Sequence, residues 1–250
     1  MGFLKIEETS PIKVLDLKSM KTVVVLPAYN CAQTLAKTLE DIPMEWVDEI
    51  VLVDDCSSDN TCDVARELGV KHIIKHSRNL GYGANQKTCY DCALSMNADV
   101  IIMLHPDYQY TPTLIPEILE RITKGSQIVF ASRMIKGLEA VRNGMPLYKY
   151  VSNRILTIFQ NLLLHKHHSE YHTGYRAYTN IVLRTIDYHK LSNDFIFDNQ
   201  FILQSFNCGF EIDEIYCPAK YEKSSSSINF KRSLKYGLLV LWYSIVYKFK

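Results

Sequence analysis

IIMLHPDYQY, residues 101 to 110, is the stretch that decides the fold. The apolar run Ile101–Leu104 has the length and composition of a buried β-strand. It delivers His105, Asp107 and Gln109 to its carboxyl end, just after two earlier apolar runs that also end in polar clusters. An acid at that place is suited to holding a metal ion and a diphosphate.

Apolar runs of strand length alternate with helix-length amphipathic segments along the chain, which predicts βαβ units and a largely parallel sheet. Strands are expected at 22–26, 49–53, 72–74, 100–104, 128–131 and near 211–217. Thr111 followed by Pro112 predicts a helix start, and Ser57 to Asp59 predicts another. The expected class is therefore α/β, with a Rossmann-like sheet flanked by helices.

The length of 250 residues, with 47% hydrophobic and 22% charged residues, suits one core and a single catalytic domain. We expect an N-terminal arm at 1–20, the domain at 21–222, and a mobile serine loop with a C-terminal helix at 223–250. A net charge of +1 gives no electrostatic support for a nucleic-acid partner.

Seven cysteines, an odd number, suit a reducing cytoplasm better than a disulfide framework. Cys89 and Cys92 form a CxxC inside a predicted helix, which favours ordinary packing over zinc or redox chemistry. The N-terminus lacks the apolar core of a signal peptide, so a cytoplasmic location is expected.

Ligands of open parallel sheets collect at the carboxyl ends of the strands. Polar clusters follow four of the predicted strands here, and they read PAYN at 27–30, DDCSSD at 54–59, RNLGYG at 78–83 and HPDYQ at 105–109. Each cluster is a weak signal alone, because Asp-Asp before Ser-Ser is often a helix cap and a GxG is usually a turn. Their shared edge predicts a site.

These pieces resemble family 2 glycosyltransferases of the GT-A fold, in the branch of dolichol-phosphate mannosyltransferase and bacterial polyprenyl-phosphate enzymes. The matching stretches are VVVLPAYN, EIVLVDDCSSDNT, RNLGYGAN, MLHPDYQYTP, ASR at 131–133 and EYHTGYRAY at 170–178. The resemblance implies a nucleotide-sugar donor, carrying uridine or guanosine diphosphate. It also implies that a base and ribose pocket is lined by Pro27, Tyr29, Asn30 and one of Asp54 or Asp55. Gly81 and Gly83 would let the chain approach the nucleotide.

The family's aspartate-x-aspartate metal motif appears here as His105-Pro106-Asp107, so an imidazole replaces the first carboxylate. The resemblance implies that Asp107 ligates a divalent cation, manganese or magnesium, with Gln109 assisting. His105 is either a further ligand, which manganese tolerates better than magnesium, or a hydrogen-bonding residue near the ribose.

The same resemblance places Arg133 near the phosphates of donor or acceptor, and the stretch 173–176 at the wall of the acceptor side. Arg176 would bind an acceptor phosphate as a planar two-pronged donor. The alternative for Arg133 is a surface ion pair. His165, His167 and His168 resemble a zinc cluster, but without a spaced partner pair a solvated or membrane-facing loop is favoured.

Asp198 in NDFIFDNQ is the candidate general base. An inverting transfer to a sugar hydroxyl benefits from such a carboxylate, whereas a lipid phosphate is already anionic and needs none. We expect transfer to a polyprenyl phosphate, with a hydroxyl of a lipid-linked or cell-surface glycan as the alternative. A further alternative is an inactive sugar-binding scaffold. Asp198 as a helix-start acid is the plain interpretation, and Phe195, Phe197 and Phe201 are expected in the core.

The tail YGLLVLWYSIVYKF, residues 236–249, is flanked by lysine and arginine. Fourteen helical residues span roughly 21 Å, which is less than the roughly 30 Å of bilayer hydrocarbon. The predicted helix is amphipathic and interfacial, which implies peripheral contact with the inner face of the membrane. The alternative is packing on the sheet or on a second subunit, in a homo-oligomer. The serine-rich stretch 221–227 resembles a segment that closes over the acceptor in relatives, but it lacks their arginine and glycine.

Overall fold

The computed structural model describes residues 19–218 and 230–249. The strands of this part form one sheet in the order β3-β2-β1-β4-β6-β5-β7. They are β1 (Thr22–Ala28), β2 (Glu49–Asp54), β3 (His72–Lys75), β4 (Val100–Met103), β5 (Ile128–Ser132), β6 (Arg176–Thr179) and β7 (Ile212–Tyr216). The six predicted strands are confirmed, with ends that shift by one or two residues.

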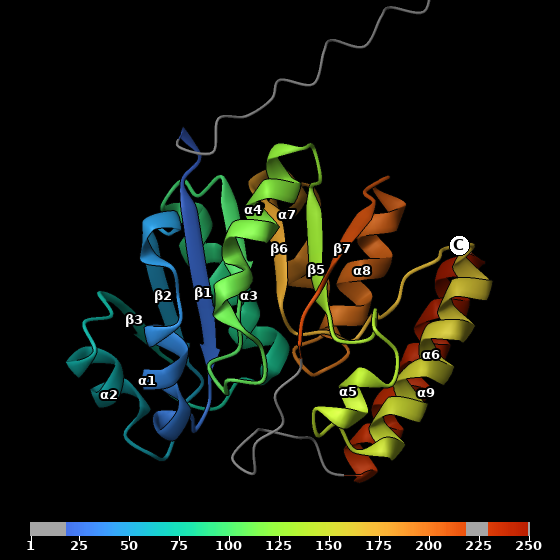
Figure 1. Ribbon diagram of the computed structural model, residues 1–250, viewed down its shortest axis with the longest axis horizontal. Helices are drawn as coiled ribbons and strands as arrows, with labels where there is room; N and C mark the ends of the chain where they lie inside the picture. The colour runs from blue at the N-terminus through green and yellow to red at the C-terminus, as the bar shows by residue number, and fades with distance from the viewer. Residues whose placement is uncertain (1–18, 219–229, 250) are drawn as a thin grey trace, which may run out of the picture.

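Helices cover both faces of this sheet (Figure 1). They are α1 (Ala32–Glu40), α2 (Thr61–Glu67), α3 (Tyr82–Ser95), α4 (Ile115–Thr123), α5 (Glu139–Arg142), α6 (Leu147–Leu164), α7 (Asn180–Thr185), α8 (Phe197–Asn207) and α9 (Phe230–Lys248). Pro112 begins a short 3₁₀ turn, Pro112–Leu114, and α4 follows it at Ile115. The α/β class is therefore confirmed.

The sheet is buried on both faces because each strand alternates its side chains between two apolar layers. Val24 and Leu26 of β1 pack in a cluster with Leu35 of α1, while Val23 and Val25 pack with Tyr90 of α3. All seven residues of β1 are buried.

The sheet reverses its strand order at β1, which pairs in parallel with β2 on one side and with β4 on the other. The crevice at such a switch point is where open α/β sheets bind ligands. The polar clusters after β1, β2 and β4 converge there.

The strand β6 was not predicted, since its residues were assigned to the acceptor-side wall. Arg176–Thr179 runs antiparallel between β4 and β5. Its four residues, RAYT, are too few for a clear apolar alternation, and its pairing partners lie far away in sequence.

The helices α6 and α9 lie side by side at the edge of the molecule (Figure 1). The helix α9 begins at Phe230, six residues before the predicted apolar stretch. It contacts α6 and α8, and Gln160 Nε2 donates to Ser244 Oγ at 3.0 Å across the α6–α9 contact. Within the described ranges, no helix combines the length and apolarity needed to cross a membrane. The N-terminal arm up to residue 18 and the serine-rich stretch 221–227 lie outside the described residues.

Candidate active site

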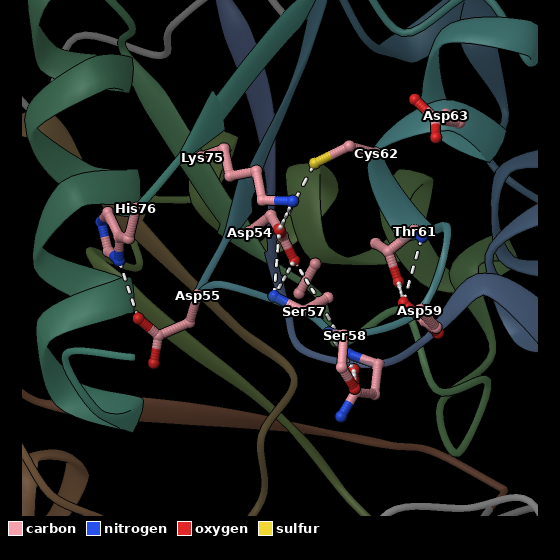
Figure 2. Close-up of polar contacts among 12 residues, drawn as sticks. Asp54, Asp55, Ser57, Ser58, Asp59, Thr61, Cys62, Asp63, Lys75 and His76 are labelled. Atoms are coloured by element: carbon pink, nitrogen blue, oxygen red, sulfur yellow. Dashed lines mark hydrogen bonds and ion pairs between the residues drawn. The ribbon is translucent and has the colours of Figure 1, made fainter. Parts of the chain in front are cut away.

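Asp54 ends β2 and Asp55 follows it directly, and the two side chains point in different directions, as those of neighbouring residues in extended chain do (Figure 2). Asp54 accepts hydrogen bonds from Ser57 N at 3.2 Å and from Cys62 Sγ at 3.4 Å, and Lys75 Nζ lies 3.9 Å away. It therefore shapes the turn that leads into α2. The helix begins at Thr61, two residues after the predicted start signal at Ser57 to Asp59, and Asp59 accepts from Thr61 N at 3.0 Å.

Asp55 is the acid that faces the glycine-containing turn. Its carboxylate accepts from the backbone amides of Leu80 at 2.8 Å and Gly81 at 2.9 Å, and His76 Nδ1 lies at 2.8 Å. Both carboxylates are thus buried and bonded within the protein. The structure assigns turn-shaping contacts to each of them.

The glycines of this turn face protein rather than open space. A Cβ at Gly81 would lie 2.6 Å from the Asn193 carbonyl oxygen, and one at Gly83 would lie 2.5 Å from that of Ser192. Lys87 holds the same segment through its bonds to His189 O, Leu191 O and Asn193 Oδ1. Because the two glycines carry no side chain, the backbone at 192–193 can pack directly against the start of α3.

Asn30 joins the loop after β1 to the loop after β2. Its backbone N donates to Ser57 Oγ at 2.8 Å, and its side-chain Oδ1 accepts from Ser58 N at 2.9 Å. The neighbouring Tyr29 has an exposed fraction of 53%, while Pro27 is buried in β1. Tyr29 is the aromatic side chain of this edge that solvent reaches most easily.

Asp107 follows β4 and is oriented by Gln109, whose backbone N and Nε2 donate to it at 3.2 and 2.7 Å. Among the described residues, no three His, Cys, Asp or Glu side chains cluster as metal ligands. The donor chemistry fits magnesium or manganese, because such ions are commonly bound by one or two carboxylates together with substrate phosphates.

His105 contacts Tyr82 by a hydrogen bond and by ring stacking. The Tyr82 hydroxyl lies 3.1 Å from His105 Nε2, and the two rings stack with centroids 5.5 Å apart. Burial lowers the pKa of His105, although Asp107 and Asp198 oppose this shift. These contacts place His105 in a hydrogen bond and a ring stack within the protein.

The Tyr82 hydroxyl also donates to Asp198 Oδ2 at 2.7 Å, and Arg176 Nη1 lies 2.9 Å from Asp198 Oδ1. A buried polar chain therefore runs from His105 through Tyr82 and Asp198 to Arg176. Asp198 stands in the first turn of α8 and is 6% exposed. Both of its oxygens are engaged by protein groups.

Arg176, expected from the sequence as a two-pronged phosphate contact, is bonded within the protein. Its side chain is 1% exposed, and Nε donates to Thr173 O at 2.7 Å. Burial alone would lower the pKa of Arg176, but the attraction of Asp198 outweighs it and the pKa lies above its ordinary value. A guanidinium held this way neutralises Asp198 inside the protein.

Arg133 is also held by an acid, in a buried pair with Glu170 instead of the surface ion pair considered from the sequence. Glu170 accepts from the Arg133 backbone N and from Asn153 Nδ2, each at 3.0 Å. The Arg133 side chain also donates to His172 O at 3.2 Å. Arg133 thus joins the end of β5 to the segment before β6.

Sequence reasoning missed Tyr82, His172 and Tyr236. His172 Nδ1 lies 2.8 Å from the Tyr236 hydroxyl, which ties α9 to the site. Burial lowers the pKa of His172 to about 3, and Arg176 and Arg133 act in the same direction. Tyr82 and His172 lie inside quoted motifs, so an aromatic within each motif was the available signal. Tyr236 carried none, because only tertiary packing brings α9 there.

The other aromatic and sulfur predictions concern packing. Phe197 and Phe201 are buried core residues as predicted, whereas Phe195 is half-buried and stacks on Tyr82 with centroids 4.9 Å apart. Cys89 is fully buried within α3 and Cys92 is half-buried. His165 and His167 are exposed after α6, while His168 stacks on Phe206 and lies 3.7 Å from Glu214.

The model of glycosyl transferase family 2 matches residues 23–187, which reach from β1 to β6 and hold the site residues up to Arg176, whereas Asp198 and Tyr236 lie beyond the match. The chain is a family 2 glycosyltransferase. It is 26% identical over 204 residues to polyprenol monophosphomannose synthase of Mycolicibacterium smegmatis, covering 79% of this chain and 76% of that one. It is also 26% identical over 178 residues to UDP-N-acetylglucosamine–dolichyl-phosphate N-acetylglucosaminyltransferase of Methanococcus voltae, covering 65% and 70%.

Among solved structures, this glycosyltransferase is similar to glucosyl-3-phosphoglycerate synthase of Mycobacterium tuberculosis in complex with Mn²⁺, UDP and glucosyl-3-phosphoglycerate. The TM-score is 0.67 at 14% identity, with 97% of this chain and 86% of the other covered. At that identity the likeness concerns the fold, and it confirms the GT-A-like architecture.

Proposed function

We propose that this glycosyltransferase moves a sugar from a nucleoside diphosphate donor to the phosphate of a polyprenyl phosphate, with inversion at the anomeric carbon. The names of the relatives from Mycolicibacterium smegmatis and Methanococcus voltae support this acceptor class. Seven free cysteines support a reducing compartment, so we place the reaction at the cytoplasmic side of the membrane.

The engagement of Asp198 carries the choice of acceptor. Arg176 pairs with one of its oxygens and Tyr82 donates to the other, so the carboxylate is poorly placed to take a proton from a sugar hydroxyl. A phosphate acceptor brings its own negative charge and needs no base. Asp198 and Arg176 then act as a neutral pair that positions Tyr82 and His105.

Donor binding is proposed for the edge formed by the ends of β1, β2 and β4. Tyr29 and Asn30 lie at the proposed nucleoside side, and Asp54 and Asp55 fix the loops around it. Asp107 would hold a magnesium or manganese ion, which neutralises the diphosphate as it leaves. Gln109 keeps the Asp107 carboxylate oriented.

A matched pair of acceptors tests the proposal: a short-chain polyprenyl phosphate and the corresponding polyprenol. The enzyme is incubated with labelled UDP- or GDP-sugars and Mn²⁺, and lipid products are extracted and counted. We expect product with the phosphate and none with the alcohol. Transfer to the alcohol, or to an added glycan but not the phosphate, would instead indicate the hydroxyl acceptor and a proton-accepting role for Asp198.

Calorimetric titration with the same donors identifies the nucleotide and separates enzyme from scaffold. We expect one donor to bind in the presence of Mn²⁺ or Mg²⁺ and to bind less tightly with chelator. Nucleotide binding without any transfer or hydrolysis, across all acceptors, would indicate a sugar-binding scaffold.

A further inference from the structure

An apolar stripe on α6 lies open to solvent. The residues at its core are Leu147, Val151, Ile155, Ile158 and Leu162, whose exposed fractions run from 45% to 73%. Their spacing of 4, 4, 3 and 4 residues keeps them on one side of the helix. Single exposed apolar residues are ordinary, but a continuous stripe along eighteen helical residues is not.

The helix α9 repeats the same arrangement. Leu234, Leu238, Trp242, Ile245 and Phe249 follow the identical spacing, and their exposed fractions run from 40% to 81%. Phe249 lies just past the end of the helix at Lys248. The helix α6 thus carries five large exposed apolar side chains, and the neighbouring α9 carries four that Phe249 continues.

The contact between the two helices uses other sides of both. Gln160 bonds to Ser244, and Leu156 lies beside Gly237 at 3.9 Å from a Cβ built there. Thr157, Gln160, Val240 and Ser244 are the buried positions of the pair. The helices are therefore fixed to each other and the stripes stay outside their contact.

The charges of the pair have a single sign. Residues 147–164 and 230–248 contain no aspartate or glutamate, and they contain six cations: Lys149, Arg154, Lys231, Arg232, Lys235 and Lys248. Lys235 lies 3.7 Å from Asp194 of the neighbouring loop. Two helices without acids, which carry cations and apolar stripes, complement anionic lipid headgroups above an apolar interior.

We propose that α6 and α9 together form a membrane-docking surface that binds an anionic lipid bilayer, with both stripes in the interface. The sequence indicated this for the tail alone, whereas the structure adds α6, which has a stripe of its own. A second copy of the chain fits less well, because joining two such surfaces would bring like charges together. Trp242 and Tyr148 suit the depth of the headgroups.

Co-sedimentation with vesicles that contain no polyprenyl phosphate tests this surface independently of the proposed reaction. The probes are vesicles of phosphatidylcholine alone and vesicles with added phosphatidylglycerol. We expect the wild type to bind the anionic vesicles at least about tenfold more tightly, and to lose most of that advantage at high salt. Equal binding to both, or binding to neither, would overturn the proposal.

Substitutions test the contribution of each helix separately. Ile155→Glu with Leu162→Glu alters α6, and Leu238→Glu with Trp242→Glu alters α9; all four side chains are exposed, so the fold should survive. We expect each pair to weaken vesicle binding at least about tenfold. The control is Ile181→Glu on α7, where a 56% exposed isoleucine lies outside both stripes.

Two outcomes contradict the proposal in this series. If the α6 variant binds vesicles as tightly as the wild type, α6 is not part of the membrane-docking surface. A wild-type dimer in gel filtration that the same substitutions convert to monomer, without an effect on vesicles, would assign the stripes to a second copy. Donor titration of each variant in solution shows that the catalytic site is intact.

Discussion

At the scale of single residues, charges buried in the site are matched inside the protein. Asp198 faces Arg176, and Glu170 faces Arg133. A buried ion pair contributes little net stability, yet removing one partner leaves an uncompensated charge. The two pairs therefore fix the segments before and after β6 rather than offering free charges to a substrate.

Asp198→Asn tests whether that carboxylate is structural. We expect the free energy of unfolding to fall by about 3 kcal/mol, because the buried Arg176 loses its counter-charge. Activity with the phosphate acceptor, measured well below the unfolding transition, should stay within about tenfold of wild type. The control is Asp194→Asn, an exposed acid of the loop before α8. Urea unfolding measures the stability and initial rates measure the activity. Near-complete loss of activity in a folded Asp198→Asn protein would show a base.

His172 predicts a pH dependence of stability. Burial lowers its pKa from 6.5 to about 3 in the folded protein, so the unfolded state binds more protons between these values. The stabilising contribution of neutral His172 should therefore be complete above pH 6.5. As the pH falls toward 3, the free energy of unfolding should decline by up to about 1.4 kcal/mol per pH unit. Urea unfolding at several pH values checks this slope. His172→Gln should flatten it, and an unchanged slope would assign the effect to other groups.

At the scale of elements, the start of α3 is fitted to the loop before α8. The Ser192 carbonyl oxygen and the Phe197 side chain pack closely against Gly83. Lys87, one turn later in α3, donates a hydrogen bond to Leu191 O of the same loop. The loop in turn leads to Asp198. The position of α8 against the sheet thus depends on small residues in α3.

Gly83→Ala should destabilise the protein, because its Cβ would lie 2.5 Å from the Ser192 carbonyl oxygen and 2.7 Å from Phe197 Cβ. We expect a loss of about 1–3 kcal/mol, the usual range for overpacking. Gly237→Ala in α9 is the matched control, since its Cβ would meet only Leu156 at 3.9 Å and alanine favours a helix by up to about 1 kcal/mol. Thermal unfolding of both variants should move in opposite directions. An unchanged melting temperature in the Gly83→Ala variant would show that the loop at 192–193 moves aside at little cost in free energy.

At the scale of the whole molecule, the sheet edge and the α6–α9 pair meet near the site. The hydrogen bond between His172 and Tyr236 links the segment before β6 to α9. The proposed lipid-binding surface and the proposed donor site therefore belong to one connected structure.

Donor and metal together should stabilise the whole fold, because a ligand that binds only the folded state raises its melting temperature. We expect a shift with donor plus Mn²⁺ that is larger than the sum of the separate shifts. Asp107→Asn should abolish the metal-dependent part, while Asp99→Asn, an acid before the same strand, should leave it unchanged. Thermal scans with and without chelator measure this. If the metal-dependent stabilisation persists in the Asp107→Asn variant, the metal binds at a site that does not include Asp107.

Local sequence patterns were enough to predict six of the strands and the polar clusters at their ends, because apolar periodicity and strand-end polar residues are local properties of the chain. Val23 to Leu26 and Ile101 to Leu104 predict buried strands, and Asp55 and Asp107 follow from their ends. Those signals need no knowledge of distant partners.

Only the tertiary structure decided what each site residue contacts. Arg176 and Asp198 are 22 positions apart, and Tyr82 is 116 positions from Asp198, yet the three meet in one buried chain. The strand β6, the packing of Gly83 on Ser192 and the α6–α9 pair likewise depend on long-range contacts. Such contacts reflect the shape and charge of partners that no local pattern encodes.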